Sequence, residues 1–392
     1  MQATVTPAAE MRAQLGAHSP REIVASGLTE QDLQRLSTRG FRVETSSAGR
    51  IGPKLVRLQI PRGHSLEQAR YAVREVNGSA TTELDYLYFL DGEASCTSGD
   101  CSRRQSVGWR AAQAIACGTV GKIGLIDTRI DLQDPSLTGR DIEVVVARRS
   151  DTRPADAGHG TAVAALLVGQ GDLSGLVPEA ALVAADAFYR GPDDERARTD
   201  VVTLVQAIEM LAEKGVQVIN LSLSGPDSPI LRQAVAAALQ AKIVLVAAVG
   251  NEGPHAPASY PAAYDGVIAV TAIDREGNIY PRANQGAYVD LSAPGVDLVL
   301  AGGGGGQALR SGSSYAAPFA TAAAAQLLGF MPDLPPARIR SVLATYSVDL
   351  GAPGRDPVFG DGLVQVGALC RAAETRFALS GRGMEQMPAA KP

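Results

Sequence analysis

The chain has 392 residues, of which 45% are hydrophobic and 5% aromatic, and its formal net charge is −5. This composition favours one large α/β domain with a smaller companion and argues against an intrinsically disordered chain. The sequence has no long block of lysine and arginine, and none of its apolar runs approaches the ~18 residues that span a bilayer. We therefore expect neither a nucleic-acid partner nor a membrane span.

Residues 1–45 are polar and rich in alanine, and we expect an N-terminal extension that is partly helical or disordered. The opening segment, "MQATVTPAAEMRAQLG", lacks the basic and apolar regions of a signal peptide. Two interpretations remain open: a leader has been removed, or the protein is not exported.

Residues 46–92 predict a small α+β domain. The segment "KLVRLQIP" alternates as a strand does, "SLEQARYAVREVN" has helical periodicity behind a serine cap, and "TTELDYLYFL" again indicates a strand. A polar linker, 93–105, follows. Residues 106–372 then form the predicted large domain, and residues 373–392 form a C-terminal tail.

The four cysteines are Cys96, Cys101, Cys117 and Cys370. Their even number is compatible with two disulfides, one of them closing a small loop between Cys96 and Cys101, and free thiols are an equally open alternative. The spacing in "SCTSGDCS" is not that of a zinc site and no histidine lies nearby, so no metal site is expected here.

Short apolar runs alternate with helical patterns throughout the large domain. Strand-like segments such as "KIGLID", "AALVAADAF", "VQVINLSLS", "IVLVAAVG" and "VIAVTAI" are separated by the helix-like segments "HGTAVAALLVG", "TDVVTLVQAIEMLAEKG" and "PILRQAVAAALQAK". This alternation predicts a doubly wound, mostly parallel sheet with helices on both faces. The glycine run 302–306 has no following Gly-Lys-Ser/Thr, so we expect a flexible or edge loop there rather than a phosphate loop.

Four reactive side chains fall where such a sheet places its sites, at the carboxyl ends of strands and the starts of helices. Asp127 ends a strand, His159 begins a helix, Asn251 follows a strand, and Ser314 begins the helix of "RSGSSYAAPFATA". Each has an ordinary interpretation when taken alone, as a turn residue or a helix cap. Together they form a set suited to acyl transfer, with a nucleophile, a base, an orienting carboxylate and an oxyanion donor.

The segments around these residues resemble the subtilisin-like serine proteases (subtilases, peptidase S8). "IGLIDTRID", "HGTAVA", "VAAVGNEG" and "SGSSYAAPFATA" are similar to the family's Asp, His, oxyanion Asn and Ser motifs, and "VINLSLSGP" to its substrate-binding strand. The resemblance covers roughly 105–372. It implies a Ser314 nucleophile, a His159 base, Asp127 as its partner and Asn251 in the oxyanion hole. We expect Pro318 in the first turn of the serine helix, where a missing N–H costs little.

The resemblance also implies how a substrate would bind. Ser222, Leu223 and Ser224 would pair with it as an added strand, and Ala248, Val249 and Gly250 would form a second pocket wall.

Two departures from the family pattern place unusual side chains beside the motifs: Arg129 stands close to Asp127 in sequence, and Tyr315 follows Ser314. The segment before "GLVPEA" is short for the family's calcium loop, so no cofactor is expected and calcium is not supported.

The resemblance implies a serine endopeptidase made as a zymogen. Residues 46–92 would act as an intramolecular inhibitor that is cut between about 90 and 105, or else as a permanent accessory domain. Cysteine use and family habit suggest a secreted or periplasmic protein. Two alternatives stay open: a non-catalytic pseudoprotease that binds peptides, and an acyl-transferring peptide ligase or cyclase.

Overall fold

The computed structural model describes residues 17–90, 120–191 and 196–365. The four cysteines with their hypothetical disulfides, the linker 93–105 and the tail 373–392 lie outside these residues. Within the described residues, no helix combines the length and hydropathy needed to cross a membrane.

The large domain is built on a seven-stranded sheet in which all neighbouring strands are parallel. Every strand of this sheet except the edge strand β6 is buried at every residue. This burial explains why the sequences of these strands are mostly apolar. The order across the sheet is β15 (Leu291–Pro294), β14 (Ile268–Ile273), β13 (Val244–Ala248), β11 (Val218–Leu221), β5 (Ile123–Asp127), β8 (Leu182–Asp186) and β6 (Ile142–Val146).

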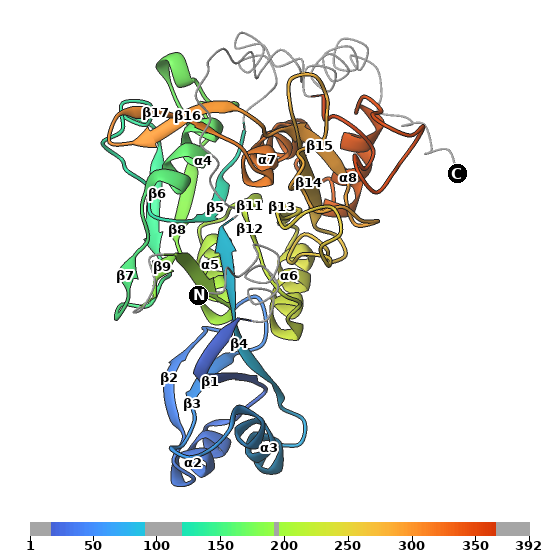
Figure 1. Ribbon diagram of the computed structural model, residues 1–392. Helices are drawn as coiled ribbons and strands as arrows, with labels where there is room; N and C mark the ends of the chain where they lie inside the picture. The colour runs from blue at the N-terminus through green and yellow to red at the C-terminus, as the bar shows by residue number, and fades with distance from the viewer. Residues whose placement is uncertain (1–16, 91–119, 192–195, 366–392) are drawn as a thin grey trace, which may run out of the picture.

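Helices cover both faces of this sheet, as the sequence predicts (Figure 1). They fall into two contacting groups: α4 (Gly158–Val168), α7 (Ser313–Phe330) and α8 (Pro336–Thr345), and α5 (Val201–Glu213) with α6 (Pro229–Gln240). Capping residues set where α5 and α6 begin, because the side chain of Asp200 accepts from Thr203 N and that of Ser228 accepts from Leu231 N. The glycine run forms the turn of a hairpin, β16 (Leu298–Gly303) and β17 (Gly306–Arg310).

The N-terminal domain begins earlier in the chain than expected. It comprises β1 (His18–Ser26), α2 (Glu30–Thr38), β2 (Arg42–Ser46), β3 (Leu55–Gln59), α3 (Leu66–Val76) and β4 (Thr81–Leu90). Its antiparallel strands have the order β2-β3-β1-β4. Since β1 and β2 both pair with β3, the boundary predicted at residue 46 falls inside this sheet, and residues 18–46 belong to the domain.

Strand β4 carries the chain from the small domain into the large one (Figure 1). Its first half pairs with β1, and its second half pairs antiparallel with β10 (Ala197–Asp200) and β12 (Leu223–Ser224) of the large domain. The short strands β9 (Tyr189–Arg190) and β7 (Arg153–Pro154) continue the same sheet. The two domains therefore share one sheet.

A buried ion pair crosses the interface between the domains. Arg57 of β3 is 1% exposed, and its guanidinium contacts Asp85 of β4 (Nε to Oδ2, 2.8 Å) and Asp200 at the start of α5. The single positive charge of Arg57 can neutralise only one of the two buried carboxylates, Asp85 and Asp200. Burial, and then the neighbouring Asp200, raise the pKa of Asp85 to about 8, so one acid of this cluster stays protonated near neutrality.

We predict that Arg57→Ala lowers the free energy of unfolding by about 3 to 5 kcal/mol, because it leaves a buried carboxylate without its cation. Urea-induced unfolding measures the change, with each substitution made in the Ser314→Ala background so that the chain stays intact. Arg39→Ala is the matched control, since Arg39 pairs with Glu75 in the same domain while their side chains are 45% and 47% exposed; a loss of less than about 1 kcal/mol is expected there. Equal losses in the two variants would contradict the prediction.

Candidate active site

The candidate residues gather at the carboxyl edge of three neighbouring strands. Asp127 is the last residue of β5, Ser222 directly follows β11, and Asn251 follows β13. These strands lie side by side in the order β13-β11-β5. Because parallel strands all end at the same edge, residues from three distant parts of the sequence meet there.

Asp127 and His159 form a buried hydrogen-bonded pair. The His159 Nδ1 atom lies 2.8 Å from Oδ1 and 3.0 Å from Oδ2 of Asp127, and the two residues are 4% and 1% exposed. The carboxylate also accepts from the backbone N–H of Thr128 at 2.7 Å. With Nδ1 as the donor to a carboxylate, the neutral imidazole keeps its acceptor lone pair on Nε2.

The loop after β5 fixes the start of the histidine helix. Thr128 Oγ1 accepts from Gly160 N (2.9 Å), and Thr161 Oγ1 accepts from Asp131 N (2.9 Å). A Cβ atom on Gly160 would lie 2.5 Å from the Thr128 carbonyl oxygen, so only glycine allows α4 to approach this loop so closely. Thr128 was not predicted from the sequence as a positioning residue, although it directly follows Asp127.

The first turn of α7 lies against both Asn251 and His159. Asn251 Oδ1 accepts from Ser313 N (3.1 Å) and Ser313 Oγ (3.0 Å), and the rings of His159 and Tyr315 are 5.3 Å apart. Ser314 lies between Ser313 and Tyr315 in the sequence and is fully buried. The structure thus pairs His159 with Asp127 and places Asn251 and the His159 ring against the helix turn that carries Ser314. It adds Ser313 as the residue that orients Asn251.

His159 Nε2 and Asn251 Nδ2 are both buried, and neither has a hydrogen-bond partner among the described residues. The Ser314 hydroxyl donates instead to the Ser222 carbonyl oxygen, at 3.1 Å. A buried polar atom without a partner is costly, so native proteins keep such atoms mainly where a ligand or a reaction uses them.

Pro318 lies deeper in its helix than the sequence analysis expected. Helix α7 begins at Ser313, so Pro318 is its sixth residue and stands in the second turn. An N–H at this position would donate to the Ser314 carbonyl, four residues earlier. Ser222 Oγ donates to that carbonyl in its place, at 2.7 Å.

The segments predicted to bind substrate flank the same turn. Ser222, Leu223 and Ser224 are buried beside α7, and β12 within this segment pairs with β4. On the other side, the segment 248–250 is also buried, and the Gly250 carbonyl accepts from Ser313 Oγ at 3.3 Å. Glu252 connects the two walls, since its Oε1 atom accepts from Ser224 Oγ at 3.4 Å.

A second carboxylate lies next to Asp127 across the sheet. Asp186 ends β8 in register with Asp127 and is paired with Arg148 (Nε to Oδ2, 2.9 Å). Burial raises the pKa of Asp186, and the positive charges of Arg148 and Arg129 partly oppose this rise. Arg129, which stands beside the aspartate motif, is exposed, and its charge acts on this neighbouring carboxylate.

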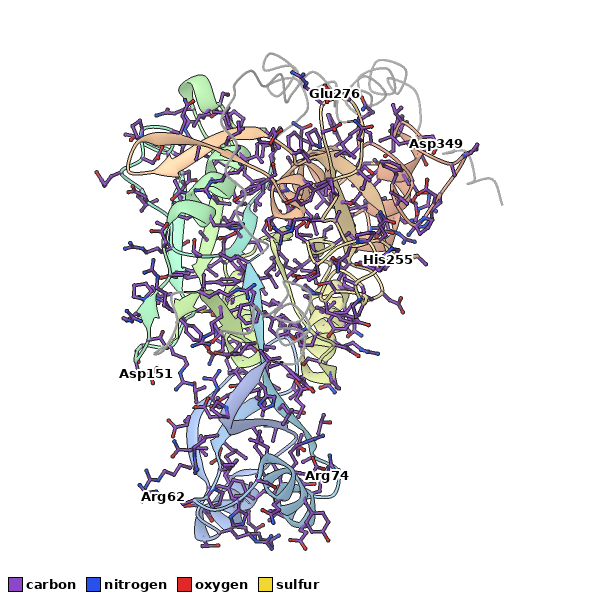
Figure 2. The ribbon with its side chains drawn as sticks, in the orientation of Figure 1. Arg62, Arg74, Asp151, His255, Glu276 and Asp349 are labelled. Atoms are coloured by element: carbon purple, nitrogen blue, oxygen red, sulfur yellow. The ribbon has the colours of Figure 1, made fainter. Side chains whose placement is uncertain are left out.

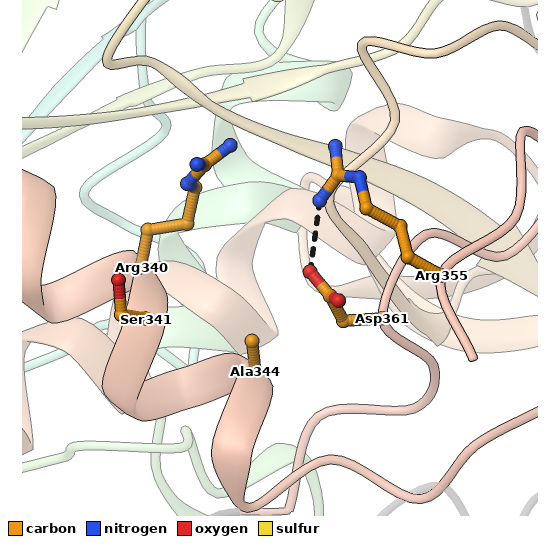
Figure 3. Close-up of a pocket in the computed structure, with 5 residues that line it drawn as sticks. All are labelled: Arg340, Ser341, Ala344, Arg355 and Asp361. Carbon is orange, nitrogen blue, oxygen red and sulfur yellow. Dashed lines mark hydrogen bonds and ion pairs between the residues drawn. The ribbon is translucent and has the colours of Figure 1, made fainter. Parts of the chain in front are cut away.

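His255 and the residues that line one hollow in the structure make none of the hydrogen bonds described above. His255 lies on an exposed loop (Figure 2). A hollow of about 370 Å³ is lined by Arg340, Ser341, Ala344, Arg355 and Asp361 (Figure 3). Its arginines already pair with carboxylates, Arg340 with Asp290 and Arg355 with both Asp290 and Asp361. Within the described residues, no group of three or more His, Cys, Asp or Glu side chains is arranged to hold a metal ion.

Comparisons with solved structures support the whole arrangement of elements. Fervidolysin from Fervidobacterium pennivorans, a keratinolytic enzyme related to subtilisin, superposes with a TM-score of 0.78 at 21% sequence identity. The match covers 90% of this chain and 61% of the fervidolysin chain. It therefore extends to the N-terminal domain as well as to the parallel sheet.

Sequence comparisons identify the family. The minor extracellular protease Epr of Bacillus subtilis (strain 168) is 31% identical over 324 residues, and the match covers 81% of this chain but only 48% of the length of Epr. Subtilisin DY of Bacillus licheniformis is 32% identical over 259 residues, which are 63% of this chain and 89% of that protein. The model of the subtilase family, peptidase S8, matches residues 118–362. Since this region is more than half of the sequence, the chain belongs to the subtilase family.

Proposed function

We propose that the protein is a serine endopeptidase in which Asp127, His159 and Ser314 form the catalytic triad and Asn251 contributes to the oxyanion hole. The observation that carries this proposal is the Asp127–His159 pair. The Nε2 atom of His159 has no partner among the described residues, and the centroid of the His159 ring lies 5.3 Å from that of Tyr315, which follows Ser314 in the serine helix. Membership of the subtilase family supports the same assignment.

In the proposed reaction, Ser314 Oγ attacks the scissile carbonyl carbon while its proton passes to His159 Nε2. The carbonyl π electrons move to the oxygen, and Asp127 stabilises the imidazolium cation through Nδ1. The imidazolium then protonates the leaving amine as the C–N bond breaks, which leaves an ester on Ser314. Water, deprotonated by the same imidazole, attacks the carbonyl carbon of this ester. The imidazolium returns the proton to Ser314 Oγ as the C–O bond breaks, which releases the acid and the free serine.

The tetrahedral intermediates place a negative charge on the former carbonyl oxygen. Asn251 Nδ2 is a buried donor without a partner among the described residues, and its amide is fixed because Oδ1 is bound to Ser313. The Ser314 N–H lies at the start of α7, where backbone N–H groups have no acceptor within the helix and the helix dipole favours negative charge. Both donors are oriented before the reaction begins, which is the condition for strong oxyanion stabilisation.

The position of β4 supports the proposal that the N-terminal domain is an intramolecular inhibitor. Leu90 and Phe89 of β4 pair antiparallel with Leu223 and Ser224 of β12, so they occupy the edge that a substrate strand would use. Tyr88 is fully buried, and its hydroxyl donates to the Pro226 carbonyl oxygen at 3.1 Å. We propose a secreted zymogen whose N-terminal domain is removed after self-cleavage downstream of β4.

Ser314→Ala tests the proposed chemistry. We expect a fluorophosphonate to label the wild-type chain and not the variant, and we expect intact-mass measurement to show a shortened wild-type chain beside a full-length variant. Product masses from a peptide substrate separate the remaining possibilities. Absence of labelling would favour a peptide-binding pseudoprotease, and products one water lighter than hydrolysis predicts would favour a ligase or cyclase.

Asn251→Ala tests the oxyanion hole. Removal of one such donor typically costs ~3 to 4 kcal/mol of transition-state stabilisation, so we expect kcat to fall by about 100- to 1,000-fold. KM should change far less, because the oxyanion exists only after attack. Steady-state kinetics on a peptide substrate provide both constants, and an unchanged kcat would rule out this role.

The domain interface is expected to weaken as the pH rises, because of a buried acid on β4. Glu83 accepts from Ser228 Oγ at the start of α6, with Asp227, Arg70, Tyr264 and Tyr88 also facing this region. Burial raises the pKa of Glu83 from 4.5 to about 7. The folded chain therefore holds a proton that the unfolded chain has lost between these pH values, and the free energy of unfolding falls as pH rises from about 4.5 to about 7.

Glu83→Gln tests this pH dependence, since an amide does not titrate. The comparison is made in the Ser314→Ala background, which is expected to keep the chain intact. We predict that thermal stability declines less between pH 4.5 and 7 in the Glu83→Gln variant than in the protein with the native acid. Parallel curves for the two proteins would show that Glu83 does not contribute.

A further inference from the structure

Three buried polar side chains connect the central strand of the sheet to the serine helix. Thr321 Oγ1 donates to Asn220 Oδ1 (2.9 Å), Asn220 Nδ2 donates to Ser222 Oγ (2.8 Å), and Ser222 Oγ donates to the Ser314 carbonyl oxygen (2.7 Å). All four residues are 0% exposed. We call Thr321, Asn220 and Ser222 the buried polar network.

We propose that the buried polar network positions the backbone of Ser314, and that this positioning sets the rate of the bond-forming step rather than the affinity for substrate. The proposal rests on the function proposed above and assigns three residues a part in it. None of the three touches the reacting atoms through its side chain, so they are positioning residues.

Pro318 leaves the carbonyl oxygen of Ser314 free to accept the last hydrogen bond of the buried polar network. In an uninterrupted helix, the N–H of residue 318 would donate to the Ser314 carbonyl, and proline has no such N–H. The carbonyl is fully buried and would otherwise lose a hydrogen bond. Ser222 supplies the missing donor from outside the helix, so the first turn of α7 is tied to the end of β11 and not only to its own second turn.

The spacing of the residues directs this connection to one face of the helix. Ser314, Pro318 and Thr321 are separated by four and three positions and therefore lie on the same face of α7, which packs against β11. The network thus holds α7 at two points, two turns apart. It fixes both the rotation of the helix about its axis and its distance from the strand.

A second hydrogen bond makes the contact between residues 222 and 314 reciprocal. Ser222 Oγ donates to the Ser314 carbonyl, while Ser314 Oγ donates to the Ser222 carbonyl at 3.1 Å. The side chain of Ser222 therefore points toward the helix, and its backbone remains the part that would contact a substrate strand. All donors in the network point the same way, which strengthens each hydrogen bond through polarisation of its neighbours.

A small displacement of Ser314 is expected to reduce the rate strongly. The Ser314 N–H and Oγ must both meet the same carbonyl group, and a shift of ~1 Å in such a geometry can cost about 100-fold in rate. Loss of one distant hydroxyl allows only a fraction of that shift. We therefore expect a loss of about tenfold from the outer end of the network.

Thr321→Val removes the outer hydroxyl and keeps the shape of the side chain. We expect kcat on a peptide substrate and the rate of fluorophosphonate labelling to fall together by about tenfold, with KM within about twofold of wild type. Thr321→Ser restores the hydroxyl and should recover most of the rate. The pH profile of kcat/KM should not move, because no member of the network titrates near neutral pH.

Thr271→Val is the matched control. Thr271 of β14 is also 0% exposed, and its hydroxyl has no hydrogen-bond partner among the described residues. The same substitution there should leave kcat within about twofold of wild type. Should Thr321→Val fail to fold, Ser222→Ala, which removes the final donor, provides the measurement, and at least the same loss of kcat is expected.

The outcomes distinguish this inference from the proposed function. A wild-type chain that neither cleaves peptides nor reacts with a fluorophosphonate overturns the proposed function and the catalytic role of the network together. An active wild-type chain whose kcat is unchanged in Thr321→Val and in Ser222→Ala overturns only the network. Equal losses in Thr321→Val and Thr271→Val would also overturn it, because they would reflect general destabilisation.

Discussion

Parallel pairing of β13, β11 and β5 is the constraint on which the candidate site depends. These three strands end at one edge of the sheet, and that edge receives Asn251, Ser222 and Asp127 from segments far apart in the sequence. The helices α4 and α7 then begin at the same edge and bring His159 and Ser314. A register shift in any one strand would move its side chains to the opposite face and would separate the groups.

The candidate site contains buried polar atoms without hydrogen-bond partners among the described residues, and these lower the free energy of unfolding. His159 Nε2 and Asn251 Nδ2 are buried without partners among the described residues, yet each of these side chains is held firmly at its other end, by Asp127 and by Ser313. This combination orients a lone pair and a donor before any substrate arrives. The stability cost is offset by a sheet whose inner strands are buried along their whole length.

The sequence predicted the large domain well because its signals are local. Asp200, Ser228 and Gly169 mark helix ends, and uninterrupted apolar runs mark buried parallel strands. Its predictions were weaker where pairing is long-range: β1 and β2 are polar or mixed segments, and their place in the small domain depends on pairing with β3. Pro318 was predicted one turn too early: counted from Ser313, where the helix begins, it is the sixth residue, and even counted from Ser314 it would be the fifth, past the first turn. The sequence gives no signal for the role of Thr321, because its partner Asn220 lies on a strand 101 residues earlier in the chain and only the fold brings the two together.

The structure also links the two domains to the candidate site through one strand. β4 carries Glu83 and Asp85 at the interface and places Phe89 and Leu90 against β12. Glu83 accepts from Ser228 at the start of α6, and Asp85 is linked through Arg57 to Asp200 at the start of α5. The residues that pair with β12 follow these acids along the strand. The buried acids of the domain interface and the residues that pair with β12 therefore belong to the same ten-residue strand. Any change that loosens the buried contacts of Glu83 or Asp85 is therefore expected to weaken the pairing of β4 with β12, which is the segment that follows Ser222.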